Sequence, residues 1–223
     1  MLTRGLWLII VLAILIVGLF AVQKSLLNLK TNEALPEIQG VLLNNPKQLP
    51  RIDLINHHDE LITQDDLKHR WSIIAYGYTH CPDVCPMLLV TLADVEKVVK
   101  RQLANVKASF YFYTVDPLRD STERLKAYVP YFSPSFIGVK AISDKDKAIF
   151  ERSLGIRSVI DGLEKGSYKV SHSQSIFLIN PKGQLQAVFM PVKRGDEILP
   201  FDSNQIYEDY VKVLRYYLTS ISD

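Results

Sequence analysis

Long apolar runs alternate with amphipathic segments along most of this chain. The runs at residues 71–78, 107–117 and 136–142 contain few polar positions. Such runs predict buried strands, because a strand that is covered on both faces has no polar side. Residues 52–63 and 175–190 each contain two shorter apolar runs around a polar turn, which predicts a hairpin. The chain therefore contains at least one sheet with a buried centre.

Between these strands, apolar residues recur at helical spacing. Asp120 resembles an N-cap, with Glu123 three residues later, and Gly155 is placed to end a helix. The order of strand, helix, strand and helix, then a hairpin and a helix, predicts a thioredoxin-like α/β fold. In α/β sheets the reactive groups gather at the carboxyl ends of the strands. The predicted helices cover residues 85–103, 121–132, 143–155 and 203–218.

The N-terminal pattern differs from the rest of the chain. Leu6 to Val22 form a run of 17 residues without charge, which as a helix extends ~26 Å and just reaches across a bilayer. The run ends in GLFAVQKS, which has no A-x-A-like cleavage site. We therefore predict an uncleaved transmembrane helix. A cleaved signal peptide and a buried core helix are the alternatives.

These patterns divide the chain into three parts. Residues 1–22 are the predicted membrane anchor, residues 23–49 a tether with short ordered pieces, and residues 50–223 the thioredoxin-like domain. A flexible tether of this length reaches ~30 Å. The basic residues around the anchor, Arg4 before it and Lys24 behind it, orient it only weakly. Export of the long C-terminal part is the topology that we expect.

Charge limits the partners of the exported part. The chain has 26 basic and 24 acidic residues. Three of the basic residues, Arg4, Lys24 and Lys30, lie in the first 30 residues, which contain no acid. The remainder is therefore near neutral. A nucleic-acid partner is not expected, because it would require a clustered basic excess.

The chain has two cysteines, Cys81 and Cys85, in the stretch GYTHCPDVCP. They follow a predicted strand and begin a predicted helix, where the helix dipole and open amides favour thiolate. A spacing of four residues on a helix allows a disulfide, a redox pair or joint binding of a soft metal ion. A purely structural disulfide would close a very short loop and stabilise the fold little.

Three motifs in order resemble the SCO/SenC family of membrane-tethered, copper-binding, thioredoxin-like proteins. They are YGYTHCPDVCP, VDPLRDSTERLKAYVPYFSPSFIGV and YKVSHSQSIFLINPKG, and the similarity extends over about residues 50–220. The resemblance implies copper as the metal and Cys81, Cys85 and His172 as its ligands. It also implies that Cys81 and Cys85 can form a disulfide. The family usually has Asp where Ser171 stands and Gly where Ala141 stands.

Several polar residues have a second, simpler interpretation. Asp116 and Asp120 fit an Asp-Pro turn and a helix cap, and the resemblance adds that their loop lies near the copper site. Among the histidines, His57, His58 and His69 are expected to face solvent. The side chain of His80 is expected to point away from the neighbouring sulfur.

The resemblance to the SCO/SenC family permits two functions. In the first, the protein is a metallochaperone that assists assembly of the binuclear copper site of cytochrome c oxidase. In the second, it is a thiol-disulfide reductase that keeps the copper-site cysteines of the oxidase reduced. The expected partners are the copper-site subunit of the oxidase, other periplasmic copper chaperones and thiol reductants. The expected location is the periplasmic face of a bacterial inner membrane, with an organellar intermembrane space as the alternative.

Overall fold

The structure is a computed structural model of the chain. It describes residue 7 and residues 11–23, 35–161, 169–172, 174–195 and 197–221. The chain divides into two compact units, Met1–Leu35 and Pro36–Asp223. Each unit is described by itself.

In the first unit, residues 11–23 form a helix. Among the described residues, no helix is both long enough and apolar enough to cross a bilayer. Part of the range Leu6 to Val22 lies outside the described residues. The anchor proposed for that range thus stays a prediction.

The second unit is built on one mixed sheet. In the described residues, eight strands pair in the order β1-β10-β9-β4-β5-β6-β2-β3. The strands β4, β5 and β6 run parallel to one another, and the remaining pairs are antiparallel. The bounds are β1 Gly40–Gln48, β2 Asp53–Asn56, β3 Leu61–Thr63, β4 Trp71–Gly77, β5 Ala108–Thr114, β6 Ile137–Ala141, β9 Ile176–Ile179 and β10 Gln184–Phe189.

The central strands bury side chains on both faces of the sheet. Along β4, Ile73 and Ala75 join one hydrophobic core, while Ile74 and Tyr76 join a second core on the other face. The side chains alternate because successive residues of a strand point to opposite faces. Two apolar layers explain why these strands appear in the sequence as continuous apolar runs. The predicted thioredoxin-like α/β arrangement is confirmed in this core.

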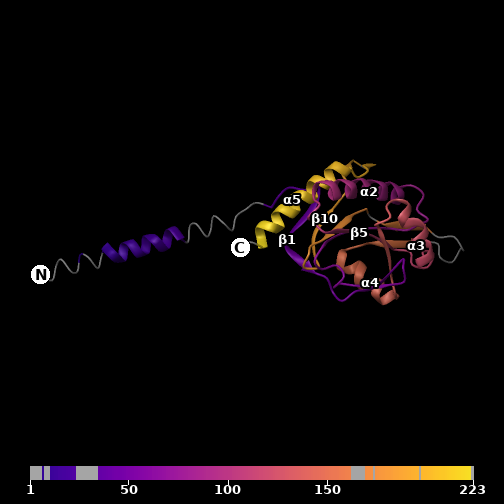
Figure 1. The fold of residues 1–223 in the computed structure, drawn as a ribbon, viewed down its shortest axis with the longest axis horizontal. Coiled ribbons are helices and arrows are strands. Elements are labelled where there is room, and N and C mark those ends of the chain that lie inside the picture. Colours follow the sequence, from indigo (N-terminus) through magenta and orange to yellow (C-terminus); the bar gives the residue numbers. More distant parts are fainter. Residues whose placement is uncertain are drawn as a thin grey trace. The chain divides into compact units, whose positions relative to one another are not determined.

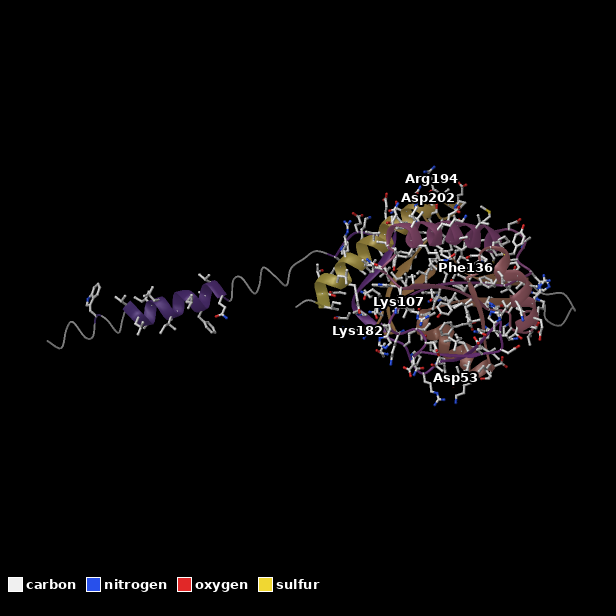
Figure 2. The ribbon with its side chains drawn as sticks, viewed as in Figure 1. Asp53, Lys107, Phe136, Lys182, Arg194 and Asp202 are labelled. Atoms are coloured by element: carbon white, nitrogen blue, oxygen red, sulfur yellow. The ribbon has the colours of Figure 1, made fainter. Side chains whose placement is uncertain are left out.

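Helices cover both faces of the sheet. The helices α2 (Val84–Gln102) and α5 (Ser203–Ile221) lie side by side over one face, and α4 (Asp144–Leu154) lies on the opposite side (Figure 1). Tyr210 of α5 packs edge-on against Trp71 of β4, with ring centroids 5.8 Å apart. Figure 2 shows Phe136 inside this unit and Arg194 and Asp202 at its surface. The predicted helices thus close the two cores.

The helix ends follow local capping chemistry. At the start of α4, the Ser143 side chain accepts a hydrogen bond from the Asp146 amide, and Gly155 ends the helix in a left-handed conformation. The helix α3 (Thr122–Tyr128) is capped by Ser121, which accepts from the Arg124 amide. The prediction that Asp120 caps this helix is therefore wrong. The carboxylate of Asp120 is buried and accepts hydrogen bonds from threonines of two other segments.

The predicted helix over residues 121–132 is shorter in the structure. The α-helix ends at Tyr128 and a 3-10 turn, η1 (Val129–Tyr131), follows it. Pro130 lacks an N–H and cannot continue an α-helical ladder. The chain then turns toward β6.

Strand β1 and two small hairpins were not predicted from the sequence. The β1 strand lies within residues 23–49, the range predicted to be a tether with short ordered pieces, and it pairs with β10. Polar residues, Pro46 and a register shift between Leu42 and Lys47 conceal its pattern. Strand β1 therefore belongs to the second compact unit, Pro36–Asp223. The two hairpins are β7 (Ser158–Asp161) with β8 (Lys169–His172) and β11 (Lys193–Arg194) with β12 (Glu197–Ile198).

Candidate metal and thiol site

The two cysteines lie at the junction between a parallel strand and the helix that follows it. Cys81 follows β4, and Cys85 lies in the first turn of α2. The amide of Cys85 donates a hydrogen bond to Cys81 Sγ over 3.4 Å. The predicted approach of the two residues at a helix start is confirmed. In this structure the two sulfurs are not joined in a disulfide.

The two thiols differ strongly in exposure. Cys85 is 1% exposed and belongs to the buried interior, whereas Cys81 is partly exposed. Gly77 makes room for Cys85, because a Cβ at residue 77 would lie 2.5 Å from Cys85 Sγ. A reagent or partner arriving from solvent therefore meets Cys81 first.

The pKa values of the thiols move in opposite directions. The pKa of Cys81 falls to about 5, chiefly because the Cys85 thiol donates a hydrogen bond to it. Burial opposes this shift, while the amides of Cys85, Asp83 and Val84 support it. The pKa of Cys85 is raised, chiefly by its hydrogen bond to Cys81 and next by burial. Near neutral pH the pair thus holds one thiolate on Cys81 and one proton on Cys85.

Cys81 opens onto a polar hollow of about 320 Å³. Its lining comes from the β4–α2 loop, from β8 and from the segment before β9. The lining residues are Tyr78, Cys81, Pro82, Asp83, Val84, Val170 and Gln174. Loops that are far apart in sequence therefore meet at Cys81.

His172, the predicted third ligand, is described only through its backbone. It ends β8 and pairs with Ser158 of β7. Val170, two residues earlier on the same strand, lines the cysteine hollow. The side chains of His172 and of its neighbour Ser171 lie outside the described residues. Among the side chains that are described, no group of three or more His, Cys, Asp and Glu could hold a metal ion.

Asp120 links the carboxyl ends of β4 and β5. Its carboxylate accepts hydrogen bonds from the Thr79 amide at 2.9 Å, the Thr79 hydroxyl at 2.6 Å and the Thr114 hydroxyl at 2.6 Å. The residue is fully buried, so these donors compensate for its loss of hydration. Asp120 thereby holds the loop that carries Cys81. Thr79 was not identified from the sequence, although its place two residues before the first cysteine is a usable signal.

Asp116 and Arg119 form a second support beside the hollow. Arg119 Nε lies 2.5 Å from a carboxylate oxygen of Asp116, which is fully buried. The Arg119 guanidinium also lies 5.7 Å from the ring centroid of Tyr78, within the range of a cation–π contact. Burial and the negative charge on Cys81 raise the pKa of Tyr78. The predicted loop with Asp116 and Asp120 is thus adjacent to the cysteines.

The other histidines require one correction. His57 was expected to face solvent but is 4% exposed, because its ring Nδ1 accepts a hydrogen bond from the Gly138 amide at 2.8 Å. Burial lowers its pKa. His58 and His69 are exposed as predicted. His80 Nδ1 lies 3.6 Å from a carboxylate oxygen of Asp120.

Comparison with known proteins gives consistent matches over the folded unit. The protein family described as SCO1/SenC matches residues 44–200. An SCO2-like protein of Rickettsia felis is 29% identical over 201 residues, which are 86% of this chain and 94% of that protein. Both matches include the cysteine loop and the segment that carries His172.

Solved structures match the same region. A crystal structure of Arabidopsis thaliana ScoI with copper bound is 28% identical, with a TM-score of 0.65 over 75% of this chain and 98% of that chain. A structure of Bradyrhizobium japonicum ScoI with copper bound is 25% identical, with a TM-score of 0.60 over 76% of this chain and 99% of that chain. In both of those proteins copper is the bound metal.

Proposed function

The chain belongs to the SCO1/SenC family, and on that premise we propose that it is a copper metallochaperone. It binds copper through Cys81, Cys85 and His172 and assists assembly of the binuclear copper site of cytochrome c oxidase. The similarity to copper-bound ScoI structures supports copper as the metal. The copper-site subunit of the oxidase is the partner that receives it.

The observation that carries this proposal is the paired sulfurs at the head of α2. Soft thiolate ligands select Cu(I) and zinc over hard cations. Cys81 with its low pKa is already a thiolate at neutral pH, and Cys85 lies within hydrogen-bonding contact of it. The donor set fits copper, because the two sulfurs can converge on one soft ion at the edge of a solvent-open hollow. Loss of the proton from Cys85 accompanies binding.

His172 is proposed as the third ligand. Support comes from its position at the end of β8, two residues after Val170, which lines the cysteine hollow. A neutral imidazole is a suitable copper ligand. Ser171 replaces the usual Asp, so the orientation of the ring depends on other neighbours of this strand.

Asp116 and Asp120 are proposed as supports rather than ligands. Both carboxylates are fully buried. Asp120 accepts hydrogen bonds from Thr79 and Thr114, and Asp116 forms an ion pair with Arg119. They hold the cysteine loop in place while the partner exchanges ligands at Cys81.

Copper loading tests the ligand set. The reduced full-length protein is expected to bind about one copper, and the protein oxidised at Cys81 and Cys85 much less, because a disulfide leaves no thiolate. Cys81→Ser, Cys85→Ser and His172→Ala are each expected to lower copper affinity by at least about tenfold. His58→Ala is the matched control, since that histidine is exposed. Equal loading of the reduced and oxidised forms would overturn the site.

The asymmetry of the thiols favours a second candidate function, thiol-disulfide reduction. Cys81 is accessible and acidic, and Cys85 is buried and keeps its proton. In such a reaction Cys81 attacks a partner disulfide and Cys85 then displaces the partner thiol, leaving a Cys81–Cys85 disulfide. His172→Ala separates the two functions. Normal oxidase assembly in that variant, despite weakened copper binding, would favour the reductase.

The membrane arrangement also belongs to this proposal. The helix over Leu6 to Val22 anchors the protein, and the unit Pro36–Asp223 works on the exported side, at the periplasmic face of a bacterial inner membrane or in an organellar intermembrane space. Other copper chaperones and thiol reductants of that compartment are the proposed donors. The near-neutral charge of the exported part is consistent with partners other than nucleic acid.

A further inference from the structure

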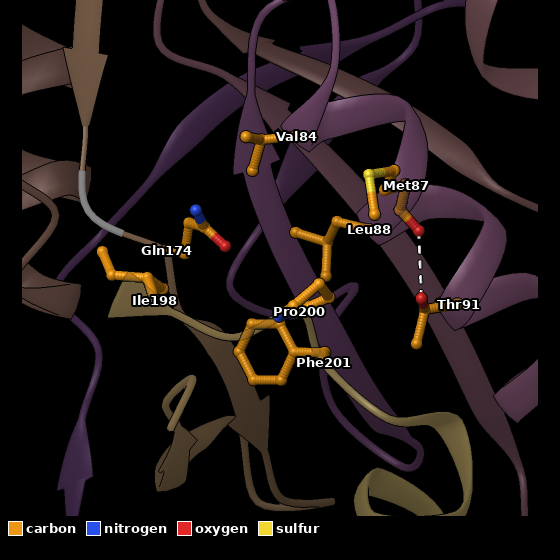
Figure 3. Close-up of a pocket in the computed structure, with 8 residues that line it drawn as sticks. All are labelled: Val84, Met87, Leu88, Thr91, Gln174, Ile198, Pro200 and Phe201. Carbon is orange, nitrogen blue, oxygen red and sulfur yellow. Dashed lines mark hydrogen bonds between the residues drawn. The ribbon is translucent and has the colours of Figure 1, made fainter. Parts of the chain in front are cut away.

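A small apolar groove lies next to the cysteine hollow (Figure 3). Leu88 and Phe201 form its buried floor, with 7% and 8% of their surface exposed. The rim is formed by Val84 and Met87 of α2 and by Ile198 of β12, all of which are well exposed. Exposed apolar side chains around a concave apolar floor are typical of an interaction site.

The size and lining of the groove limit what it can hold. Its volume is about 80 Å³, whereas small-molecule sites usually measure ~300–1,000 Å³. Thr91 and Gln174 supply its polar side chains, and the Thr91 hydroxyl donates to the Met87 carbonyl over 3.0 Å (Figure 3). The groove therefore suits one uncharged aliphatic side chain and excludes a cofactor or a charged group.

The groove is continuous with the cysteine hollow. Val84 and Gln174 line both spaces. A peptide segment with one side chain in the groove thus lays its neighbouring residues over the hollow, where Cys81 is accessible. The occupant that satisfies both spaces is a protein segment in which an aliphatic residue lies close to a cysteine.

We propose that this groove binds an aliphatic side chain near the reactive cysteine of the protein partner and so selects and orients that partner at Cys81. The identification of the partner as the copper-site subunit of the oxidase rests on the proposed function. The preference for an aliphatic neighbour follows from the groove alone. Partial burial of one such side chain is expected to favour reaction by about tenfold over a serine of the partner.

Two synthetic peptides test the preference without copper. Each carries one cysteine as a mixed disulfide with 2-thiopyridine, and they differ in one residue near the cysteine, leucine in one and serine in the other. The Cys81 thiolate of the reduced full-length protein attacks the peptide sulfur. The new disulfide joins Cys81 to the peptide, and 2-thiopyridine leaves with the electron pair and is measured by its absorbance. The leucine peptide is expected to react about tenfold faster.

Matched substitutions assign the effect to the groove. Met87→Glu and Ile198→Glu place a charge on its rim and are expected to reduce the leucine-to-serine rate ratio to nearly one. Val90→Glu is the control, because Val90 is an exposed residue of α2 that does not line the groove. The Val90→Glu variant should react with both peptides as the unmodified protein does, because its new charge lies outside the groove. Equal rates for the two peptides in the unmodified protein, or the same loss in Val90→Glu, would overturn the proposal.

This outcome is independent of the copper test. If the protein prefers the leucine peptide but does not bind copper, the groove proposal stands and the proposed carrier function fails. If the protein binds copper through the cysteines but shows no preference between the peptides, the carrier function stands and the groove proposal fails.

Discussion

At the scale of single residues, one hydrogen bond gives the two thiols different protonation states. Cys85 donates to Cys81, which makes the outer sulfur a thiolate and keeps the inner one protonated. Gly77 and the packing around it keep Cys85 buried. Reactivity is therefore confined to one sulfur, even though both residues belong to one motif.

This division predicts an unusual pH profile for Cys81. In the reduced, copper-free protein, the rate of alkylation by iodoacetamide is expected to rise through a midpoint near pH 5, because the thiolate is the nucleophile and the pKa of Cys81 is about 5. An ordinary thiol has its midpoint near ~8.5. The Cys85→Ala variant loses the donor, so its midpoint should move up. A midpoint that stays in place in Cys85→Ala would contradict the hydrogen bond as the cause.

The same shift has a stability consequence with a definite sign. The pKa of Cys81 is lower in the folded than in the unfolded protein, so between about pH 5 and pH 9 the unfolded chain binds more protons. The contribution of Cys81 to stability is therefore complete above the ordinary thiol pKa and disappears as the pH falls to about 5. The free energy of unfolding of the reduced protein, measured with urea, should lose this contribution on acidification. The Cys81→Ser variant lacks the thiol and should not show this loss.

At the scale of elements, the start of α2 is pressed closely against the end of β4. A Cβ at Gly77 would also lie 3.2 Å from the ring of Phe112 on β5. Glycine thus lets the helix approach the sheet at the level of the second cysteine. The position of Cys85 is set by this contact between a strand and a helix.

The contact predicts an energetic coupling between Gly77 and Cys85. Gly77→Ala should lower the free energy of unfolding by about 1–3 kcal/mol, because it overfills a packed interior. Cys85→Ala removes the sulfur that the new methyl group would meet, so the double variant should lose less than the two single variants together. Urea unfolding of all four proteins measures the coupling. Strict additivity would show that the strain falls on Phe112 instead.

The hairpin β7–β8 is joined to the folded unit through a polar cluster. Ser158 of β7 donates to Glu151 of α4 at 3.3 Å. Glu151 also accepts from Lys147 at 2.6 Å and from the buried Tyr113 hydroxyl at 3.2 Å. Because Ser158 pairs directly with His172, this cluster fixes the backbone of the proposed third ligand.

The element pattern shows what could be predicted from the sequence. The strands β4, β5 and β9 were predicted correctly, because apolar residues on both faces leave a strong signal. The edge strand β1 was missed because it contains many polar residues, and the two hairpins were missed because their strands are short. The C-terminal end of α4 was predicted correctly from Gly155, because capping at that position is purely local.

The site was predictable as far as its chemistry is local. Cys81 and Cys85 follow from a motif at a strand–helix junction. Asp120 was assigned to a cap, because its true partners Thr79 and Thr114 are brought to it by the parallel pairing of β4 and β5. His57 was misplaced for the same reason, since the Gly138 amide that it binds is 81 residues away in sequence.

At the scale of the whole molecule, the chain contains a short N-terminal unit and a larger folded one. The proposed anchor predicts how the protein fractionates. The full-length protein should remain with membranes after alkaline carbonate extraction, because an apolar helix of this length is retained by the bilayer. A version that begins at Pro36 should be recovered in the soluble fraction. A mature protein that starts after about residue 22 and is soluble would identify a cleaved signal peptide instead.

The pairing of β1 with β10 has a consequence for synthesis. The Gln186 side chain donates to the Leu43 carbonyl across 143 residues of sequence. At ordinary translation speeds this separation corresponds to roughly 7–30 seconds between the appearance of β1 and that of β10. During that delay β1 waits with open hydrogen-bonding groups, and its asparagines, its lysine and Pro46 discourage pairing with other nascent chains. The polar character that hides this strand in the sequence thus protects it until its partner arrives.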